Sequence, residues 1–596
     1  IYKSSKVSCS MNDELETLKG DKKIPLKTLI KRTLVYIKPE KKAFILSLLM
    51  VMVNVILDML SPLLTSTLTD ELVSDNVRLS FIINISILAF VIVVVSQTFL
   101  YIESKILQNC GQRIIFRLRN EIFQHIENMS LNQFAQMPVG SLVTRVTSYT
   151  ASMSDLFTGV LVRILKDITT LIGVYVVMFV ISPSLSLVMV GVIILVFVVS
   201  FVFSKYISSV FRKERAAISD LNSFLSENIA GMKLTQIFNQ EERKDEEFVE
   251  KNNEIYKQTR NVIKGFGIFR PLVSTIYNLS VALSFTLGVI FHLTAGEIVA
   301  FYLFLSRFFN PIQDLADQLN ALQKAFTASE RIFNLLDVKP DVLDSEDALE
   351  IDNFKGHIEF KNVWFAYEGE DWILKDVSFE IEPKTTCAFV GATGAGKTTI
   401  LQLIVRNYEV QKGEILIDGI NINKIKISCL RKAIGQMLQD VFLFSGSIAS
   451  NITLHDDRFS NEDILEACKY VNADSFIDKL PNGINEEIIE KGENLSQGQR
   501  QLLSFARTVI HKPQVLILDE ATANIDTETE VLIQKSLEKM KNIGTMLVVA
   551  HRLSTIQHAD QIIVLQHGEI IERGNHQELL HKHGYYYKLY QLQFEG

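Results

Sequence analysis

The residues best suited to chemistry form the stretch GATGAGKTT at 391–399. Its spacing fits the pattern G-x-x-x-x-G-K-[ST], with the basic residue at Lys397 and a hydroxyl at Thr398. An apolar β-like run precedes the stretch and a helix-like run follows it, which is the context that this motif requires. The sequence therefore predicts a phosphate-binding loop rather than an ordinary glycine-rich turn.

Each residue type in this loop has a physical role. Glycines let successive backbone N–H groups converge on phosphate oxygens, and the start of the following helix adds a positive dipole. Lys397 can reach the β- and γ-phosphates, and Thr398 can ligate Mg²⁺. We therefore expect an ATP site with bound Mg²⁺, whose loop contacts are Gly391, Thr393, Gly394, Ala395, Gly396, Lys397, Thr398 and Thr399.

Two further apolar runs end in residues that could complete such a site. Residues 515–518 lead into Asp519 and Glu520, so a buried strand would present Asp519 to Mg²⁺ and Glu520 to the attacking water. Residues 545–550 lead into His551, which would sense or polarise the γ-phosphate. Lone histidines are usually structural, but this one ends a strand in a chain that also has the loop and the acid pair.

The second half of the chain has the pattern of a soluble domain. From about Ile332 the long apolar runs stop, and short strands alternate with helices and turns. We expect a linker at 331–356 and a nucleotide-binding domain at 357–596. Near its start, Tyr367 offers a flat ring on which adenine could stack, with a core tyrosine as the alternative.

The first half of the chain has the pattern of a membrane domain. At 596 residues and 48% hydrophobic content, the chain is too long and too apolar for one ordinary soluble domain. Its first half holds apolar runs of about 20 residues, each long enough to cross a hydrocarbon core of about 30 Å. We expect a transmembrane domain at 25–330, with helices near 43–66, 80–101, 160–182, 185–204, 268–293 and 298–318.

The segment before the first apolar run is basic. Residues 1–10 precede Met11, the expected start, and are interpreted as a cloning remnant or an unprocessed leader within a tail at 1–24. Residues 19–42 carry many lysines and apolar residues at helical spacing, which indicates an interfacial helix on an anionic leaflet. A solvated charged linker is the alternative. No small-residue cleavage site is present, so we expect no cleavable signal peptide.

The loops between the apolar runs predict the orientation. Links after the first, third and fifth runs are poor in Lys and Arg, whereas the N-terminus and residues 102–159 and 205–267 are rich in both. By the positive-inside rule, the N-terminus, both long segments and the second half of the chain are cytoplasmic. We expect a multi-pass protein of the cell membrane, whose helices continue into the cytoplasm with tips that contact the ATPase.

Polar residues within the apolar runs need partners, because a charge at mid-bilayer costs at least about 2.5–3.5 kcal/mol. Asp58 and Arg307 are the candidates to line an internal cavity. A second group either forms a structural pair near the interface or contacts substrate: Arg163, Lys166 and Asp167. The remaining polar residues in the runs include Asn54, Gln97, Asn310 and Asp314.

Charge and cysteine content exclude other classes. The net charge is −8 and no long basic block is present, which argues against a nucleic-acid partner. The five cysteines are scattered without C-x-x-C spacing, so neither a disulfide framework nor a zinc site is indicated.

From about residue 25 onward, the chain resembles an ATP-binding cassette exporter half-transporter of the multidrug and lipid type, with the type IV fold. LSQGQ at 495–499 stands in the place of the family's LSGGQ signature, and Gln439 matches the glutamine that couples nucleotide to the membrane domain. The membrane half agrees, since residues 140–145 and 227–231 resemble the two cytoplasmic coupling segments. The resemblance implies an all-α six-helix transmembrane domain with long cytoplasmic extensions, followed by an α/β P-loop (RecA-like) domain with an α-helical signature subdomain.

The resemblance also implies residue roles. Glu520, His551 and Gln439 would be catalytic, with Gln439 a third Mg²⁺ ligand beside Thr398 and Asp519. Signature residues of one subunit would contact ATP bound by the other: Ser496, Gly498 and Gln499.

Three positions depart from the family pattern. Gln497 replaces the first signature glycine, the stretch ANID replaces SALD at 523–526, and Tyr149 replaces an Asp of the first coupling segment. A side chain at Gln497 crowds the approach of the signature to the γ-phosphate on the opposite subunit. The combination resembles the catalytically complete subunit of a bacterial heterodimeric multidrug exporter, so a heterodimer is favoured and a homodimer is possible.

The function that the resemblance implies is ATP-driven export of amphipathic small molecules by alternating access, with hydrolysis of ATP to ADP and phosphate. One alternative is a lipid or peptide exporter. An alternative of another class is an ATP-gated regulator or channel that transports nothing, against which the acid pair at 519–520 argues. The sequence does not select the substrate, because a mostly apolar cavity accepts many amphiphiles.

Overall fold

The structure is a computed structural model that describes residues 23–437, 441–519, 527–549 and 556–594. The chain divides into two compact units. The first comprises Ile1–Asn128 and Gln136–Lys339, and the second comprises Met129–Ala135 and Pro340–Gly596. The first unit is helical and the second is α/β, which confirms the predicted fold class.

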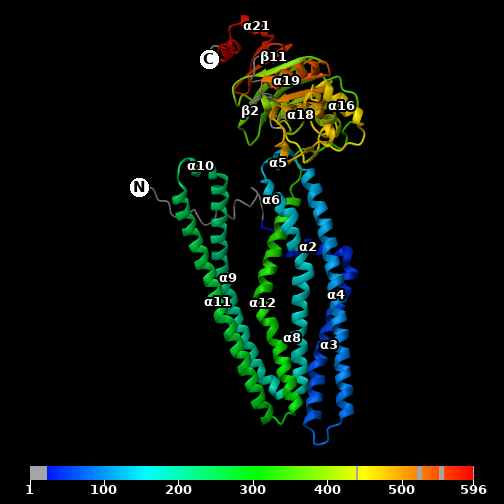
Figure 1. Cartoon of the computed structure of the whole chain (residues 1–596), viewed down its shortest axis with the longest axis vertical. Helices are drawn as coiled ribbons and strands as arrows, with labels where there is room; N and C mark the ends of the chain where they lie inside the picture. Colours follow the sequence, from blue (N-terminus) through cyan, green and yellow to red (C-terminus); the bar gives the residue numbers. More distant parts are fainter. Residues whose placement is uncertain (1–22, 438–440, 520–526, 550–555, 595–596) are drawn as a thin grey trace. The chain divides into compact units, whose positions relative to one another are not determined.

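Long helices dominate the first unit (Figure 1). The six predicted apolar runs fall in α3 (Lys41–Val73), α4 (Leu79–Glu127), α8 (Leu161–Ile181), α9 (Pro183–Ala230), α11 (Glu241–Ile290) and α12 (Ala295–Leu336). Among the described residues, five segments are long and apolar enough to cross a membrane, and they include the first five of these helices. The sixth predicted run lies in α12, which is not one of the five.

The other segments of this unit are short. They are α2 (Leu26–Val35), η1 (Lys38–Glu40), α6 (Val139–Thr144), η2 (Arg145–Tyr149), α7 (Thr150–Asp155), η3 (Leu156–Val160) and α10 (Met232–Ile237).

Several helices extend well past their apolar runs. α4, α9 and α11 have 49, 48 and 50 residues, or about 75 Å each at 1.5 Å per residue, which exceeds twice a bilayer core. α9 and α11 run as a pair joined at α10 (Figure 1). Phe203 of α9 stacks on Phe269 of α11 with ring centroids 3.9 Å apart. The predicted helical continuation of both long segments is confirmed.

The ends of α3 and α12 are held in register. A capping box at Thr294 and Glu297 starts α12. The Asp70 carboxylate, on α3, accepts hydrogen bonds from the Gly296 backbone N–H (2.7 Å) and the Thr294 hydroxyl (3.0 Å). A Cβ atom at Gly296 would lie 2.1 Å from the Ser66 carbonyl oxygen, so only glycine allows this close approach.

Polar residues inside the bundle bond across helices. The Asn54 side chain donates to the Ser96 carbonyl oxygen (2.9 Å), and the Ser96 hydroxyl donates to Asp58 (3.1 Å), which joins α3 to α4. Gln318 on α12 donates to the Asp167 carboxylate on α8. For Asp167, the structure therefore shows a structural contact within the bundle.

The basic N-terminal segment forms a shorter helix than the spacing predicts. Among the described residues of this segment, α2 ends at Val35 and the 3₁₀ turn η1 follows, because Pro39 has no backbone N–H with which to continue the α-helical hydrogen bonds. Leu29 of α2 is buried, and Arg32 forms a bidentate pair with Asp337 (2.6 and 2.8 Å). An exposed apolar stripe remains at Leu26, Ile30 and Leu34.

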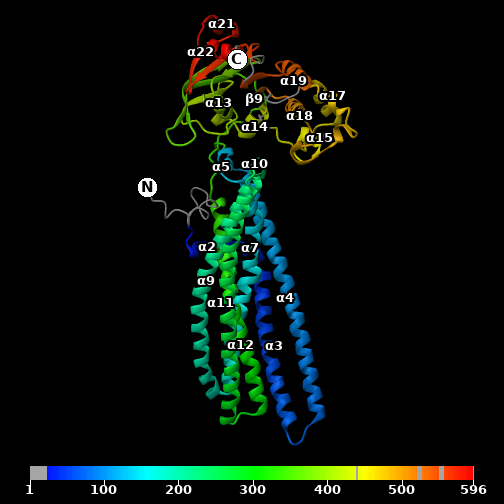
Figure 2. The same cartoon turned by 60° about the vertical axis from the view of Figure 1, so that its left-hand side comes forward.

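The second unit contains two main sheets, and helices such as α13 (Lys397–Ile404), α14 (Ile427–Ala433) and α18 (Gln497–Ile510) surround its strands (Figure 2). The six-stranded sheet has the order β12-β11-β3-β10-β9-β6, in which only β12 is antiparallel to its neighbour, and the antiparallel sheet has the order β2-β1-β4-β5. The strands are β1 (Ile358–Ala366), β2 (Trp372–Ile381), β3 (Thr386–Val390), β4 (Lys412–Ile417), β5 (Ile420–Asn421), β6 (Ile434–Met437), β9 (Val515–Asp519), β10 (Thr545–Val549), β11 (Gln561–Gln566) and β12 (Glu569–Gly574), with a separate β7 (Gly446–Ser447) and β8 (Glu487–Ile488) pair.

Helices cover these sheets and form two cores. One core lies between the antiparallel sheet, the six-stranded sheet and the first helix after β3, and the other holds the helical subdomain on β6, β9 and β10. The helices and turns are α5 (Leu131–Ala135), α13 (Lys397–Ile404), η4 (Ile422–Lys424), α14 (Ile427–Ala433), α15 (Ile448–Thr453), α16 (Asn461–Tyr470), α17 (Asp474–Ile477), η5 (Gly483–Asn485), η6 (Glu490–Gly492), α18 (Gln497–Ile510), α19 (Thr527–Met540), α21 (His576–His581) and α22 (Tyr585–Phe594).

Candidate nucleotide site

The glycine-rich loop leaves the carboxyl end of a fully buried strand. All five residues of β3 are buried, as expected for a central parallel strand, and the loop continues into α13. Gly396 has φ +100°, and a Cβ atom there would lie 2.6 Å from Leu374 Cδ2. A Cβ atom at Gly391 would lie 2.3 Å from the Leu565 carbonyl oxygen. The loop therefore takes a path that only glycine permits at these two positions.

Lys397 places a positive charge within the loop. Its side chain is 6% exposed, and Nζ donates to the carbonyl oxygens of Gly391 (2.8 Å) and Ala392 (3.0 Å). The N-terminus of α13 has Gly396 as its N-cap and no side-chain cap, so no side chain competes for its first N–H groups. Gly394 faces open space, and Thr393 and Thr398 are exposed. This donor set fits a polyphosphate.

Ala395 and Thr399 have buried side chains, so they offer the loop backbone rather than side chains to a ligand. The Thr399 hydroxyl is instead within hydrogen-bond distance of the Tyr367 hydroxyl, at 3.1 Å. The Tyr367 ring follows β1, is 42% exposed and contacts Tyr408 edge-on at 5.1 Å. It is thus a half-exposed ring beside the loop, and not a core tyrosine.

The acidic strand end lies at the same sheet edge. β10 pairs in parallel with both β3 and β9, so it lies between them. The loop follows the carboxyl end of β3 and Asp519 is the last residue of β9, so the two lie two strand spacings, or about 10 Å, apart. Asp519 lies opposite Val549, the last residue of β10. Glu520, His551 and Gln439, which follow β9, β10 and β6 in the sequence, lie outside the described residues.

The signature segment starts a helix. Ser496 caps α18: its hydroxyl accepts from the Gln499 N–H (3.2 Å), and the Gln499 side chain accepts from the Ser496 N–H (2.9 Å). Gln497, the first helical residue, is exposed, and Gly498 is buried. The S-x-x-Q spacing of the sequence is a capping-box pattern. The interpretation of these residues as a signature alone missed this helix start. Sequence reasoning also missed Arg500, which donates to the Gly492 (3.1 Å) and Leu495 (3.0 Å) carbonyl oxygens and holds the segment before the helix.

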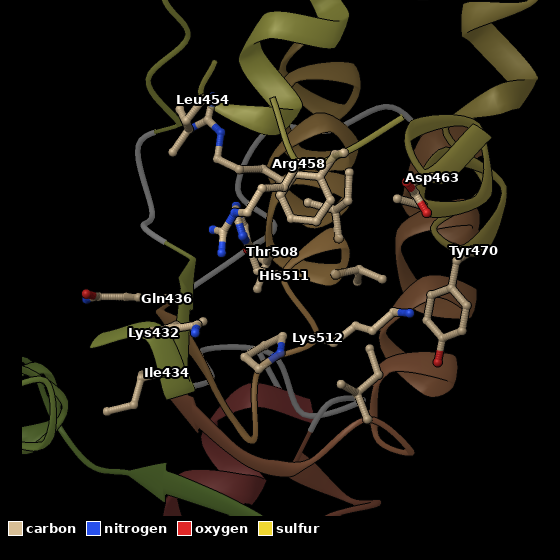
Figure 3. Close-up of a pocket in the computed structure, with 18 of the residues that line it drawn as sticks. Lys432, Ile434, Gln436, Leu454, Arg458, Asp463, Tyr470, Thr508, His511 and Lys512 are labelled. Atoms are coloured by element: carbon tan, nitrogen blue, oxygen red, sulfur yellow. The ribbon is translucent and has the colours of Figure 1, made fainter. Parts of the chain in front are cut away.

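Away from the glycine-rich loop, the same unit holds a cavity of about 900 Å³ (Figure 3). It is lined by the edge strand β6, by α14 and α16, and by the carboxyl end of α18. Pro513 and Ile543, which precede β9 and β10, place it at the sheet edge opposite the glycine-rich loop. None of the described candidate ATP-site residues lines it. Burial lowers the pKa of its His511 below the ordinary value.

Comparisons with known proteins agree with this architecture. The family models described as ABC transporter transmembrane region and ABC transporter match residues 44–312 and 374–523. The probable multidrug resistance ABC transporter ATP-binding/permease protein YheH of Bacillus subtilis is 40% identical, over 84% of this chain and 75% of that protein. The ATP-dependent lipid A-core flippase of Syntrophus aciditrophicus is 33% identical, over 83% of both chains.

A solved structure, described as a bacterial Atm1-family ABC exporter with ATP bound, superposes with a TM-score of 0.78 at 25% identity, over 93% of this chain and 98% of that one. The fold and the loop thus define a membrane-spanning ATPase with its nucleotide-binding domain in the cytoplasm. The chain belongs to the ABC transporter family and is an ABC exporter half-transporter, which binds and hydrolyses ATP to drive transport. Half-transporters of this family typically work as dimers.

Proposed function

We propose that the chain exports amphipathic small molecules of the multidrug type by alternating access, as one half of a dimer. The observation that carries the proposal is the loop-bound Lys397 on a P-loop domain that follows a long apolar helical bundle. The description of the Bacillus subtilis relative as a probable multidrug resistance protein supports this substrate class. We assign residues 25–330 to the transmembrane domain, 331–356 to the linker and 357–596 to the nucleotide-binding domain.

In this proposal the loop residues and Lys397 hold the phosphates, and Tyr367 stacks on adenine. Thr398, Asp519 and Gln439 would hold Mg²⁺, which stabilises charge on the transferring phosphate when bound. Glu520 aligns or deprotonates the attacking water, and His551 senses the γ-phosphate. The exposure of Thr398 and the position of Asp519 at the same sheet edge support this division of roles.

The partner subunit would supply the second half of each ATP site. Ser496, Gly498 and Gln499 would contact ATP bound by the opposite subunit, and the exposed N-terminus of α18 supports this role. The Ser496 hydroxyl accepts one hydrogen bond and can still donate its own proton to a phosphate oxygen. We favour a heterodimer because the exposed Gln497 side chain stands where the ligand must approach.

An exporter of lipids or peptides is the alternative, supported by the relative described as a lipid A-core flippase. A regulator or channel that transports nothing is the alternative of another class. Inverted membrane vesicles that contain the chain and its partner decide among them. We expect ATP-dependent uptake of amphipathic dyes. Uptake of labelled lipid alone would favour the lipid exporter, and ATP hydrolysis without uptake of any probe would favour the regulator.

A further inference from the structure

Arg307 occupies an unusual position in the helical bundle. It lies on α12 within a predicted apolar run, and its Nη1 atom is buried with no hydrogen-bond partner among the described residues. A buried donor without a partner costs free energy, and a cation in a membrane-spanning segment costs more. An ionisable residue in such a segment is by default a candidate for a functional contact.

The register between α3 and α12 places Arg307 at a defined depth. Asp70 bonds Gly296 at the outer ends of the two helices. Asp58 lies 12 residues inward from Asp70, and Arg307 lies 11 residues inward from Gly296. At 1.5 Å per residue these steps are about 18 and 17 Å, so Asp58 and Arg307 lie at nearly the same level, close to the middle of a bilayer core of about 30 Å.

Buried phenylalanines flank Arg307 along α12. Phe304 and Phe308 on α12 are buried beside it in the sequence, and both belong to the apolar core of the bundle. Asp58 is within electrostatic range. However, the Asp58 carboxylate accepts a hydrogen bond from Ser96, and the buried Arg307 Nη1 atom makes none among the described residues.

We propose that Arg307 binds the anionic head group of the transported amphiphile, so that the export substrates are organic anions with an apolar tail. The inference rests on the proposed export function and narrows its substrate class. A guanidinium presents a planar fork of N–H donors that matches a carboxylate or a phosphate, and the low dielectric of the bundle strengthens this pairing. Phe304 and Phe308 are buried in the core here, so they would supply an apolar surface for the tail only in the state that admits the ligand.

The negative charge of Asp58 gives the proposal a test by matched substitution, because Asp58 and an anionic ligand are both attracted to Arg307. If Arg307 is a binding group, Asp58 competes with the ligand for it. Removing the Asp58 charge then strengthens anion binding, whereas removing the Arg307 charge weakens it. A structural pair would respond differently, because loss of either partner would impair the protein in the same direction.

The test uses the full chain purified in detergent and reconstituted with its partner. The probes are dansyl-undecanoate, its uncharged methyl ester and a dansyl quaternary ammonium of equal chain length. Binding is measured by fluorescence, and uptake is measured in proteoliposomes.

Phosphatidylglycerol serves as competitor, since its displacement of the carboxylate would identify a lipid phosphate as a ligand of the same site. Arg270→Gln, at an exposed arginine of α11, is the control for loss of one positive charge.

We expect Arg307→Gln to weaken carboxylate binding by about 10- to 100-fold, the effect of losing a hydrogen bond to a charged group, with the methyl ester unaffected. Arg307→Lys should retain part of the affinity, Asp58→Asn should increase it, and Arg270→Gln should not change it. Equal loss for carboxylate and ester would overturn the proposal. A second result would also overturn it: unchanged carboxylate binding by Arg307→Gln together with a lower basal ATPase rate and a weaker dimer. That result would assign Arg307 to a contact with the partner subunit.

Two outcomes separate this inference from the proposed function. Transport of the quaternary ammonium or the ester without any Arg307-dependent carboxylate binding would overturn the inference and leave export intact. Arg307-dependent carboxylate binding without uptake of any probe would support the site and count against export.

Discussion

Lys397 folds back over its own loop, where its Nζ atom donates to the Gly391 carbonyl oxygen at 2.8 Å. The side chain is buried, so the ammonium charge is held within the loop by backbone carbonyl oxygens. The charge is therefore positioned before any phosphate oxygen reaches it.

Lys397→Ala removes the charge that we assign to the β- and γ-phosphates. We expect tight ATP binding to be lost, measured by equilibrium binding of a fluorescent ATP analogue. Lys384→Ala, at a turn outside the loop, is the control and should bind like the wild type. Micromolar affinity retained by Lys397→Ala would count against the assigned role.

Tyr367 tests adenine stacking separately from the phosphate contacts. Tyr367→Ala removes the ring, and a stacking contribution of about 0.5–1.5 kcal/mol corresponds to an affinity loss of about 2- to 12-fold for ATP. Tyr367→Phe retains the ring and loses only the hydroxyl near Thr399, so it should bind nearly like the wild type. If both variants lose affinity equally, the hydroxyl contact matters and the stacking does not.

Gln497 tests the assembly. If its side chain impairs the signature, the chain alone should hydrolyse ATP weakly, and the natural partner should restore activity. Gln497→Gly should raise the activity of the isolated chain. Wild-type homodimer activity as high as that of Gln497→Gly would remove the reason to favour a heterodimer.

Glu520 follows Asp519 in the sequence and is the proposed general base. Glu520→Gln retains size and hydrogen bonding but removes the base, so ATP should still bind while turnover falls by about 10²–10⁴-fold. We expect this variant to hold the two nucleotide domains closed with the cavity facing outward. ATP binding and steady-state hydrolysis are measured on the same preparation. Hydrolysis within about threefold of wild type would exclude the assigned role, since general-base catalysis contributes far more.

His511 makes part of the stability pH-dependent. Burial lowers its pKa below the ordinary value of 6.5, and the nearby Asp456 opposes this shift only in part. The unfolded chain therefore binds more protons than the folded chain below about pH 6.5, so the contribution of neutral His511 is full above that pH and declines as the pH falls through it. His511→Gln should show a shallower loss of thermal stability between about pH 7.5 and 5.5 than the wild type. His581→Gln, at an exposed histidine, should retain the wild-type slope.

Much of the fold could be predicted because its signals are local. Apolar runs of membrane length, the strand–loop–helix pattern around Gly391 and the S-x-x-Q spacing at Ser496 each depend on residues within about one element. Reliance on local patterns also explains why the helix expected through the basic N-terminal segment is longer than the one observed. The lysine-rich segment has continuous helical periodicity, but α2 ends at Val35 and the turn η1, which contains Pro39, follows it.

The candidate site was predicted less completely. Residue type and spacing propose Lys397, Asp519 and Tyr367 as site residues, and the parallel order of β3, β10 and β9 brings the loop and Asp519 to one sheet edge. The sequence could not predict that Lys397 bonds to its own loop or that Tyr367 contacts Thr399. Both contacts depend on side-chain rotamers and on packing between β1 and α13.

By itself, the sequence determined a membrane-helical half joined to a P-loop half, since periodicity and motif spacing are written along the chain. Only the tertiary structure decided which distant residues meet. Asp70 and Gly296 are 226 residues apart, yet their bond sets the level at which Asp58 and Arg307 lie in the bundle. The cavity beside His511 likewise exists only where β6, α14, α16 and the carboxyl end of α18 converge. Such contacts depend on the simultaneous packing of several elements, and no local pattern encodes them.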